Sequence, residues 1–167
     1  MRRKEREILD RREIDEILER AEVCRIALAD DSVPYLVTMN YGYRPGERPA
    51  LFLHSASQGK KLDIIRRNNL ACFQVSLDHQ MIETKVRCNC GMQYKSVVGM
   101  GRISVLTDYE EKIAGLNCLV RRYHGQDRPR YTPAYVNATT VLRLDIEELT
   151  GKKCEGPSQP NPLLPVG

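Results

Sequence analysis

Short apolar segments separated by turn residues dominate the first third of the chain. Residues 24–29 form one such run, which ends at the turn cluster 30–32, and residues 34–41 form a second run. A polar loop at 44–49 separates them from a third run at 50–54. Strands joined by short turns pair antiparallel, whereas parallel strands need long crossovers that are usually helical. This order therefore predicts an antiparallel sheet rather than a doubly wound parallel sheet.

Later segments extend the same pattern. Further strands are predicted at 70–77, 94–106 and 139–146, and helices at 10–21, 58–68 and 108–123. Two helices open with a capping-box pair, Asp10 with Glu13 and Asp108 with Glu111. The fold class predicted is mainly β with helices: a six-stranded antiparallel barrel flanked by about three helices.

Smaller features complete the prediction. Gly99 and Gly101 indicate a bulge or bend within the long strand. Residues 124–138 are expected to be a loop, and residues 147–151 a helical turn ended by glycine.

The length of 167 residues fits one domain, predicted over residues 1–153, followed by a proline-rich tail at 154–167. No apolar run approaches the roughly 18 residues of a membrane-spanning helix, and no apolar stretch follows the charged residues 1–6. We therefore expect a cytoplasmic protein with no membrane partner.

The six cysteines favour neither a disulfide framework nor a metal site. The chain shows no secretory context, and Cys24 and Cys72 lie inside apolar runs. Both are therefore expected to be buried free thiols. Cys88 and Cys90 form the one local pair, and no second pair at zinc-site spacing accompanies it. No metal is expected.

The segment between the third strand and the second helix carries the strongest chemical signal. Ser57 is a plausible N-cap, which places Lys60 and Lys61 in the first helical turn. Cations there oppose the helix dipole, which favours anions. A bound phosphate would resolve the conflict, because backbone N–H groups, hydroxyls and ammonium groups would converge on it. The alternative is that both lysines point into water.

Other phosphate motifs are missing. The chain contains neither the P-loop pattern nor the dinucleotide fingerprint. The net charge of +4 and the acid-free segment 85–102 suit a polyanion, but that segment lacks the interleaved aromatic residues of a nucleic-acid platform. No nucleic-acid partner is expected.

Three sequence blocks resemble a known family. Residues 24–29, 34–43 and the pattern Leu-Phe-Leu-His-Ser-Ala-x-x-Gly-Lys-Lys at 51–61 resemble the flavin-binding split-barrel proteins related to pyridoxamine 5′-phosphate oxidase. Within them the chain is most similar to the nitroimidazole-resistance branch. Residues 94–101 and 144–152 match further family segments.

This resemblance implies a six-stranded split barrel that forms a homodimer and binds FMN at the subunit interface. By position, residues 37–40 would lie along the flavin ring, largely through backbone groups, and the 54–61 segment would hold the phosphate and ribityl end. The implied cofactor-binding residues are Val37, Thr38, Met39, Asn40, His54, Ser55, Ser57, Gly59, Lys60, Lys61, Ser96 and Val97.

The function implied is an FMN-dependent oxidoreductase, similar to a nitroreductase, that passes electrons to a small aromatic or nitro compound. His54 is the catalytic candidate, as a proton donor or as a hydrogen-bonding partner of the cofactor, and the second role is favoured. Trp is absent, so Tyr41, Tyr43 or Tyr94 would stack on the ring, whereas His79 and His124 are expected at the surface. The alternative is a non-catalytic flavin- or haem-binding carrier or sensor module.

Overall fold

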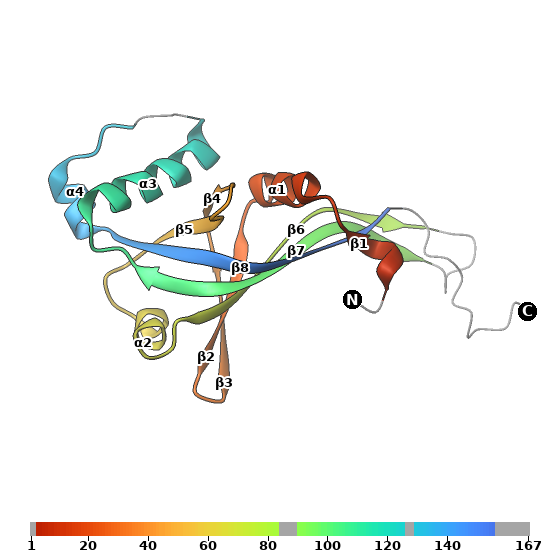
Figure 1. Ribbon diagram of the computed structural model, residues 1–167, viewed down its shortest axis with the longest axis horizontal. Coiled ribbons are helices and arrows are strands. Elements are labelled where there is room, and N and C mark those ends of the chain that lie inside the picture. Colours follow the sequence, from red (N-terminus) through yellow and green to blue (C-terminus); the bar gives the residue numbers. More distant parts are fainter. Residues whose placement is uncertain (1–2, 84–89, 126–128, 156–167) are drawn as a thin grey trace, which may run out of the picture.

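The computed structural model describes residues 3–83, 90–125 and 129–155, and most of it is one antiparallel sheet (Figure 1). The strands are β1 (Glu7–Ile8), β2 (Cys24–Asp30), β3 (Val33–Met39), β4 (Gly42–Arg44), β5 (Ala50–Ser55), β6 (Leu70–Ile82), β7 (Gly91–Val105) and β8 (Thr140–Cys154). The helices are a 3-10 turn, η1 (Lys4–Arg6), and α1 (Arg11–Arg20), α2 (Lys60–Arg67), α3 (Tyr109–His124) and α4 (Pro133–Ala138).

The sheet confirms the predicted antiparallel, mainly β fold. Its strands lie in the order β3-β2-β6-β7-β8-β5-β4, and β1 pairs with β8. All six predicted strands are present, and the short strands β1 and β4 are added to them. Figure 1 shows the long strands β6, β7 and β8 running through the centre, with the β2–β3 hairpin projecting from one side and α3 and α4 at one end.

The predicted helical turn at 147–151 is wrong. Strand β8 continues through it to Cys154, because residues in this stretch pair with β7 on one side and with β1 on the other. Gly151 does not end a helix: a Cβ there would lie 2.8 Å from the Ile8 side chain. The glycine therefore permits close packing of β1 and α1 on the sheet.

The predicted loop at 124–138 is also wrong in part, since it contains α4. The Thr132 side chain accepts a hydrogen bond from the Tyr135 amide, and Pro133 occupies the first helical turn. An N-cap threonine followed by proline is a helix start signal that the sequence carried.

The predicted bulge in the long strand is confirmed. The pairing of β7 with β8 shifts between Met100 and Gly101. A Cβ at Gly101 would lie 1.9 Å from the Asp145 carbonyl oxygen, so only glycine fits this close approach.

Helix α1 closes the main core. Its stripe of Ile14, Ile17 and Leu18 is buried against the sheet, where Phe73 is also buried. Full burial of each such side chain contributes about 1.5–3 kcal/mol. The Asp10 side chain caps the helix by accepting a hydrogen bond from the Arg12 amide. The predicted reciprocal bond from Glu13 is not formed, because the Glu13 carboxylate accepts from Lys153 of β8 instead.

A second, smaller core lies beneath α3. Phe52 and Val141 of the sheet pack with Leu116 and Leu119 of the helix. The Asp108 side chain caps α3 by accepting from the Glu111 amide, which is one half of the predicted capping box. The Glu111 carboxylate accepts from Arg143 instead of from the Asp108 amide.

Two further points concern the chain as a whole. Within the described residues, no helix is both long and apolar enough to cross a bilayer. Of the tail predicted at 154–167, Cys154 belongs to β8, and residues 156–167 lie outside the described residues.

Candidate functional site

The start of α2 differs from the prediction in one respect. Gly59, rather than Ser57, is the N-cap, and no side chain caps the helix. Gly59 has a φ of 135°, in the region that favours glycine, and an added Cβ would meet nothing within 4 Å. Ser57 lies in the loop before it. The first backbone N–H groups of α2 therefore have no side-chain cap, and the glycine before them leaves open space beside them.

The two lysines of this turn have different surroundings. The Lys60 ammonium lies 3.3 Å from an Asp30 carboxylate oxygen and 5.5 Å from the centre of the Tyr35 ring. Lys61 is half-buried, and among the described residues its side chain makes no hydrogen bond or ion pair. Burial lowers the pKa of Lys61, with no opposing carboxylate to raise it. The turn therefore presents an ammonium group that lacks a counter-charge.

Strand β3 supplies the residues predicted to follow the flavin ring. It forms one end of the strand order, so the backbone groups on its outer side pair with no other strand among the described residues. Met39 is buried and Val37 packs against the core, whereas Thr38 and Asn40 are exposed. A ligand along β3 would therefore meet backbone groups and alternate side chains. The Lys60–Tyr35 contact places the start of α2 beside this strand.

A pocket of about 310 Å³ connects two predicted site residues, Asn40 and His54. Its other lining residues come from α3 and from the segment around α4: Leu116, Leu119, Val120, Tyr123, His124, Tyr131 and Tyr135. His124 is exposed, as expected, and it also lines this pocket. Tyr131 and Tyr135 were not predicted as site residues, because their segment, 124–138, was expected to be a loop.

Tyr123 fixes one wall of this pocket. Its hydroxyl donates to the Glu22 carbonyl at 2.6 Å and accepts from the Tyr41 amide at 3.1 Å. These bonds tie α3 to the segments that follow α1 and β3.

Ser96 and Val97 are not brought to the other predicted residues within one chain. Val97 is fully buried in the core. Ser96 lies on the same sheet face as Thr38, but two strands separate β7 from β3. At the usual strand spacing that is about 14 Å.

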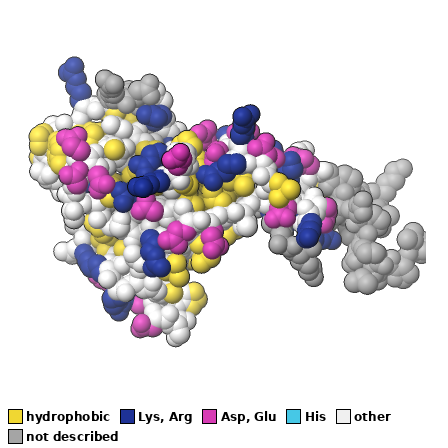
Figure 2. All heavy atoms as spheres, viewed as in Figure 1, with side chains coloured by type: hydrophobic (Ala, Val, Ile, Leu, Met, Phe, Trp, Pro, Cys, Tyr) yellow, Lys and Arg dark blue, Asp and Glu magenta, His cyan; other side chains and the backbone are white. Residues whose placement is uncertain are grey.

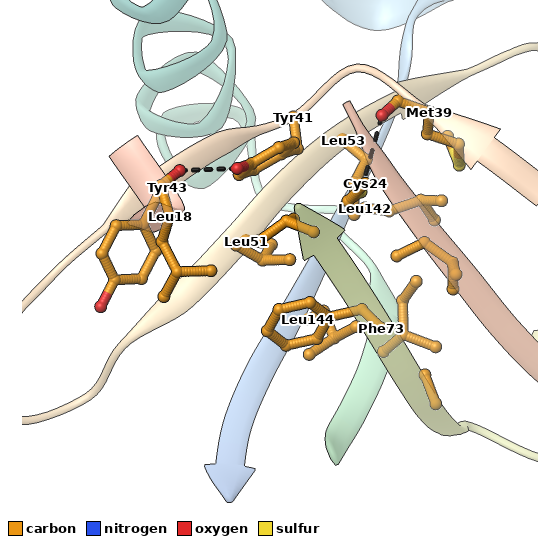
Figure 3. Packing of buried hydrophobic residues seen from close by; sticks show 14 of the residues in the cluster. Leu18, Cys24, Met39, Tyr41, Tyr43, Leu51, Leu53, Phe73, Leu142 and Leu144 are labelled. Carbon is orange, nitrogen blue, oxygen red and sulfur yellow. Dashed lines mark hydrogen bonds between the residues drawn. The ribbon is translucent and has the colours of Figure 1, made fainter. Parts of the chain in front are cut away.

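Two of the tyrosines expected to stack on the flavin cannot do so. Tyr41 is fully buried, and its hydroxyl donates to the Leu18 carbonyl (Figure 3). Tyr43 is also buried and donates to Asp15. Burial raises the pKa of both phenols, so both are neutral core residues. Tyr94 is half-buried, with the Lys152 ammonium 5.9 Å from its ring centre.

The charges do not gather into one basic surface on the face shown in Figure 2, where Lys and Arg side chains alternate with Asp and Glu. Part of the acid-free segment 85–102 lies outside the described residues, including Cys88. Within the described ranges, no cluster of His, Cys, Asp and Glu is arranged to hold a metal. Burial raises the pKa of the Cys24 thiol to about 12, which makes it unreactive.

Three solved structures are similar to this chain. A candidate 5-nitroimidazole antibiotic resistance protein of Bacteroides thetaiotaomicron is 30% identical, with 88% of this chain and 86% of that chain covered and a TM-score of 0.77. The flavocytochrome Anf3 of Azotobacter vinelandii is 20% identical (95% and 74% covered, TM-score 0.78), and the FAD and heme binding protein of Mycobacterium smegmatis is 21% identical (92% and 76% covered, TM-score 0.79). No curated protein matches the chain.

The open antiparallel sheet with its flanking helices is the split-barrel fold of these neighbours. The family model for pyridoxamine 5′-phosphate oxidase matches residues 10–153. The chain belongs to that family.

Proposed function

We propose that the chain is an FMN-binding oxidoreductase that passes electrons to a small aromatic or nitro compound. The observation that carries the proposal is the start of α2, where the half-buried Lys61 lacks a counter-charge beside uncapped backbone N–H groups. A phosphate monoester offers the missing negative charge and several acceptor oxygens. Family membership and the FAD-binding and nitroimidazole-resistance neighbours support a flavin as the molecule that carries it.

The residues of this chain fit FMN in three parts. Lys60, Lys61 and Ser55 would hold the phosphate end, and the unpaired outer edge of β3 would hydrogen-bond the ring. Asn40 would lie at the open side of the ring, and because His54 lines the same pocket as Asn40, we assign His54 to that side rather than to the phosphate end that the family resemblance implies. When bound, the flavin supplies the electron transfer, and the protein supplies binding and orientation. The His54 side chain makes no hydrogen bond or ion pair among the described residues, so it is available to cofactor or substrate.

The first test is a comparison of flavins. We expect the purified protein to show flavin absorption bands, or to bind added FMN with a rise in melting temperature. Because riboflavin lacks the phosphate, its affinity should be lower than that of FMN by a factor of about ten or more. Titration with FMN, riboflavin and FAD measures this order. A colourless protein that is indifferent to FMN would overturn the proposal.

We also propose that a second copy of the chain completes the site. One row of side chains crosses four strands on the outer sheet face, namely Leu36, Ala27, Cys72 and Met100, and all of them remain at least partly exposed. Leu36 is 64% exposed and Met100 is 39% exposed. Ser96 lies on the same face, so a partner docked there could bring its own Ser96 to the flavin.

Sedimentation of charge variants tests the dimer. Leu36→Glu should give a monomer that binds FMN at least tenfold more weakly, because it places a charge in the proposed interface. Leu9→Glu is the matched control, since Leu9 is 85% exposed and lies outside this row. A monomeric wild-type protein that binds FMN fully would contradict the dimer and leave the flavin proposal standing.

The haem-binding neighbours favour one second candidate, a non-catalytic flavin or haem carrier. Reduction by a nicotinamide donor followed by electron transfer to a nitroarene distinguishes the enzyme from the carrier. A haem absorption band in the purified protein would favour the second candidate.

A further inference from the structure

We propose that the pocket between α3 and the segment around α4 binds the ring of a neutral, planar aromatic substrate, with Tyr135 and Val120 determining specificity. This inference deepens the proposed function and rests on it, because the pocket shares Asn40 and His54 with the proposed flavin site.

Aromatic side chains form the outer wall of the pocket. The rings of Tyr131 and Tyr135 stack with their centres 6.0 Å apart and their planes 6° from parallel. Tyr135 is 53% exposed and stands at the mouth of the pocket, whereas Tyr131 packs against the second core. Flat rings stack favourably on such a surface, beyond the gain from buried area alone.

Aliphatic side chains of α3 form the floor. Leu116 and Leu119 are nearly buried, and Val120 is half-buried beside them. The Tyr123 hydroxyl is already committed to Glu22 and Tyr41, so its ring is held in place as a further wall. The volume of about 310 Å³ lies at the small end of the range for ligand sites, which suits one substituted ring.

The polar groups of the pocket specify the substituent. The side chains of Asn40, His54 and His124 make no hydrogen bond or ion pair among the described residues, although all three line one pocket. Asparagine and histidine can each donate to an acceptor such as a nitro or carbonyl oxygen. The Tyr131 hydroxyl is buried and lacks a partner in the described chain, so a small ring movement could add one more donor.

The charge of the described lining disfavours other ligand classes. Among the residues that the structure describes (126–128 are not among them), no lysine, arginine, aspartate or glutamate lines the pocket. A phosphate or a nucleotide would lack a counter-charge here, in contrast to the start of α2. The geometry therefore favours a neutral ring with one acceptor substituent.

Calorimetric titration of the full-length protein with 4-nitrobenzyl alcohol, a neutral nitroarene, tests the site. Cyclohexylmethanol, which lacks the flat ring and the nitro group, is the ligand control and should bind at least tenfold more weakly. Val120→Phe fills the pocket and should abolish nitroarene binding. Tyr135→Ala removes the stacking surface and should weaken it about threefold to tenfold.

Leu9→Phe is the matched control, since Leu9 is 85% exposed and lies outside both the pocket and the proposed flavin-binding strand β3. It should bind the nitroarene as the wild type does. FMN binding is measured on every variant, and the nitroarene titration is run with and without FMN. Full FMN binding together with unchanged nitroarene affinity in Val120→Phe would overturn the pocket assignment alone. Loss of FMN binding in the wild type would instead overturn the proposed function.

Discussion

The start of α2 and the α3–α4 pocket differ in almost every physical respect. The first is a turn of two lysines and uncapped amides, whose pattern appears within eight consecutive residues. The second, drawn from residues 40 to 135, has an aliphatic floor, stacked tyrosines and three polar side chains that find no partner in the described part of the chain. One site suits a compact anion and the other a neutral ring.

This difference shows how the chain could separate cofactor from substrate. Under the two proposals, the start of α2 would hold the charged phosphate end of FMN, and the pocket would hold the neutral ring of the substrate beside the flavin. They meet through β3 and β5, because Lys60 contacts Tyr35 of β3, whereas the pocket includes Asn40 directly after β3 and His54 of β5. Variants that affect one region and spare the other test this division.

The largest effect is expected at Lys61. Lys61→Met keeps the buried carbon stem but removes the ammonium, and a hydrogen bond to a charged group contributes about 1.5–3 kcal/mol. FMN should therefore bind about 10- to 100-fold more weakly, whereas riboflavin, which has no phosphate, should be unaffected. Fluorescence titration of both flavins measures this.

Arg66→Gln is the control on the same helix, because Arg66 is exposed and pairs with Asp63. An equal loss of FMN and riboflavin affinity in Lys61→Met would place the phosphate elsewhere.

The next effect is expected at the wall of the pocket. Tyr123→Phe removes the hydroxyl that joins Glu22 to Tyr41 and leaves a backbone N–H without its partner. The melting temperature should fall by about 2–6 °C. Nitroarene binding should weaken more than FMN binding, as separate titrations would show. Tyr109→Phe, also on α3, should change neither, since its hydroxyl makes no hydrogen bond in the described chain.

The sheet and the two-lysine turn at the start of α2 were predictable because their signals are local. Apolar runs bounded by turn residues predict β2, β3 and β5. The lysines at 60–61 are conspicuous because cations in the first turn of a helix oppose its dipole. The N-cap was misplaced because a serine cap and a glycine with φ of 135° are both compatible with the sequence. The distinction depends on the path of the chain after β5.

The pocket could not be predicted in the same way. Its residues come from segments 40 to 135 and meet only after β5, α3 and α4 have packed together. The Thr132–Pro133 start signal could have revealed α4. Nothing local indicated that Tyr41 and Tyr43 would be core residues, because only the tertiary fold gives their hydroxyls the Leu18 carbonyl and Asp15.

Without flavin, Lys61→Met is expected to have a smaller effect, and to stabilise the protein rather than weaken a function. Burial lowers the pKa of Lys61 from its ordinary value of 10.5, so the charged form is less favourable in the folded state than in the unfolded state. This penalty is fully present at neutral pH. Lys61→Met should therefore raise the melting temperature of the flavin-free protein by about 1–2 °C at pH 7.

The stability of the flavin-free protein should also change with pH in a defined direction. The unfolded chain holds the Lys61 proton to higher pH, so wild-type stability should rise as the pH passes through the lowered folded pKa towards 10.5. The advantage of Lys61→Met should shrink over that interval. Thermal melts from pH 7 to 10.5 measure it, and a constant advantage would show that packing, not charge, is responsible.

The smallest effect is expected at Asp30, which pairs with Lys60 and with Arg67. Asp30→Asn removes a carboxylate that competes with a phosphate for the Lys60 ammonium. Because exposed ion pairs contribute only about 0.2–1 kcal/mol, FMN affinity should rise by about twofold to fivefold. Asp63→Asn, which breaks the Arg66 pair on the same helix, should leave it unchanged. A gain that vanishes in high salt and is missing for riboflavin would identify Lys60 as a phosphate ligand, whereas no gain for FMN would exclude it.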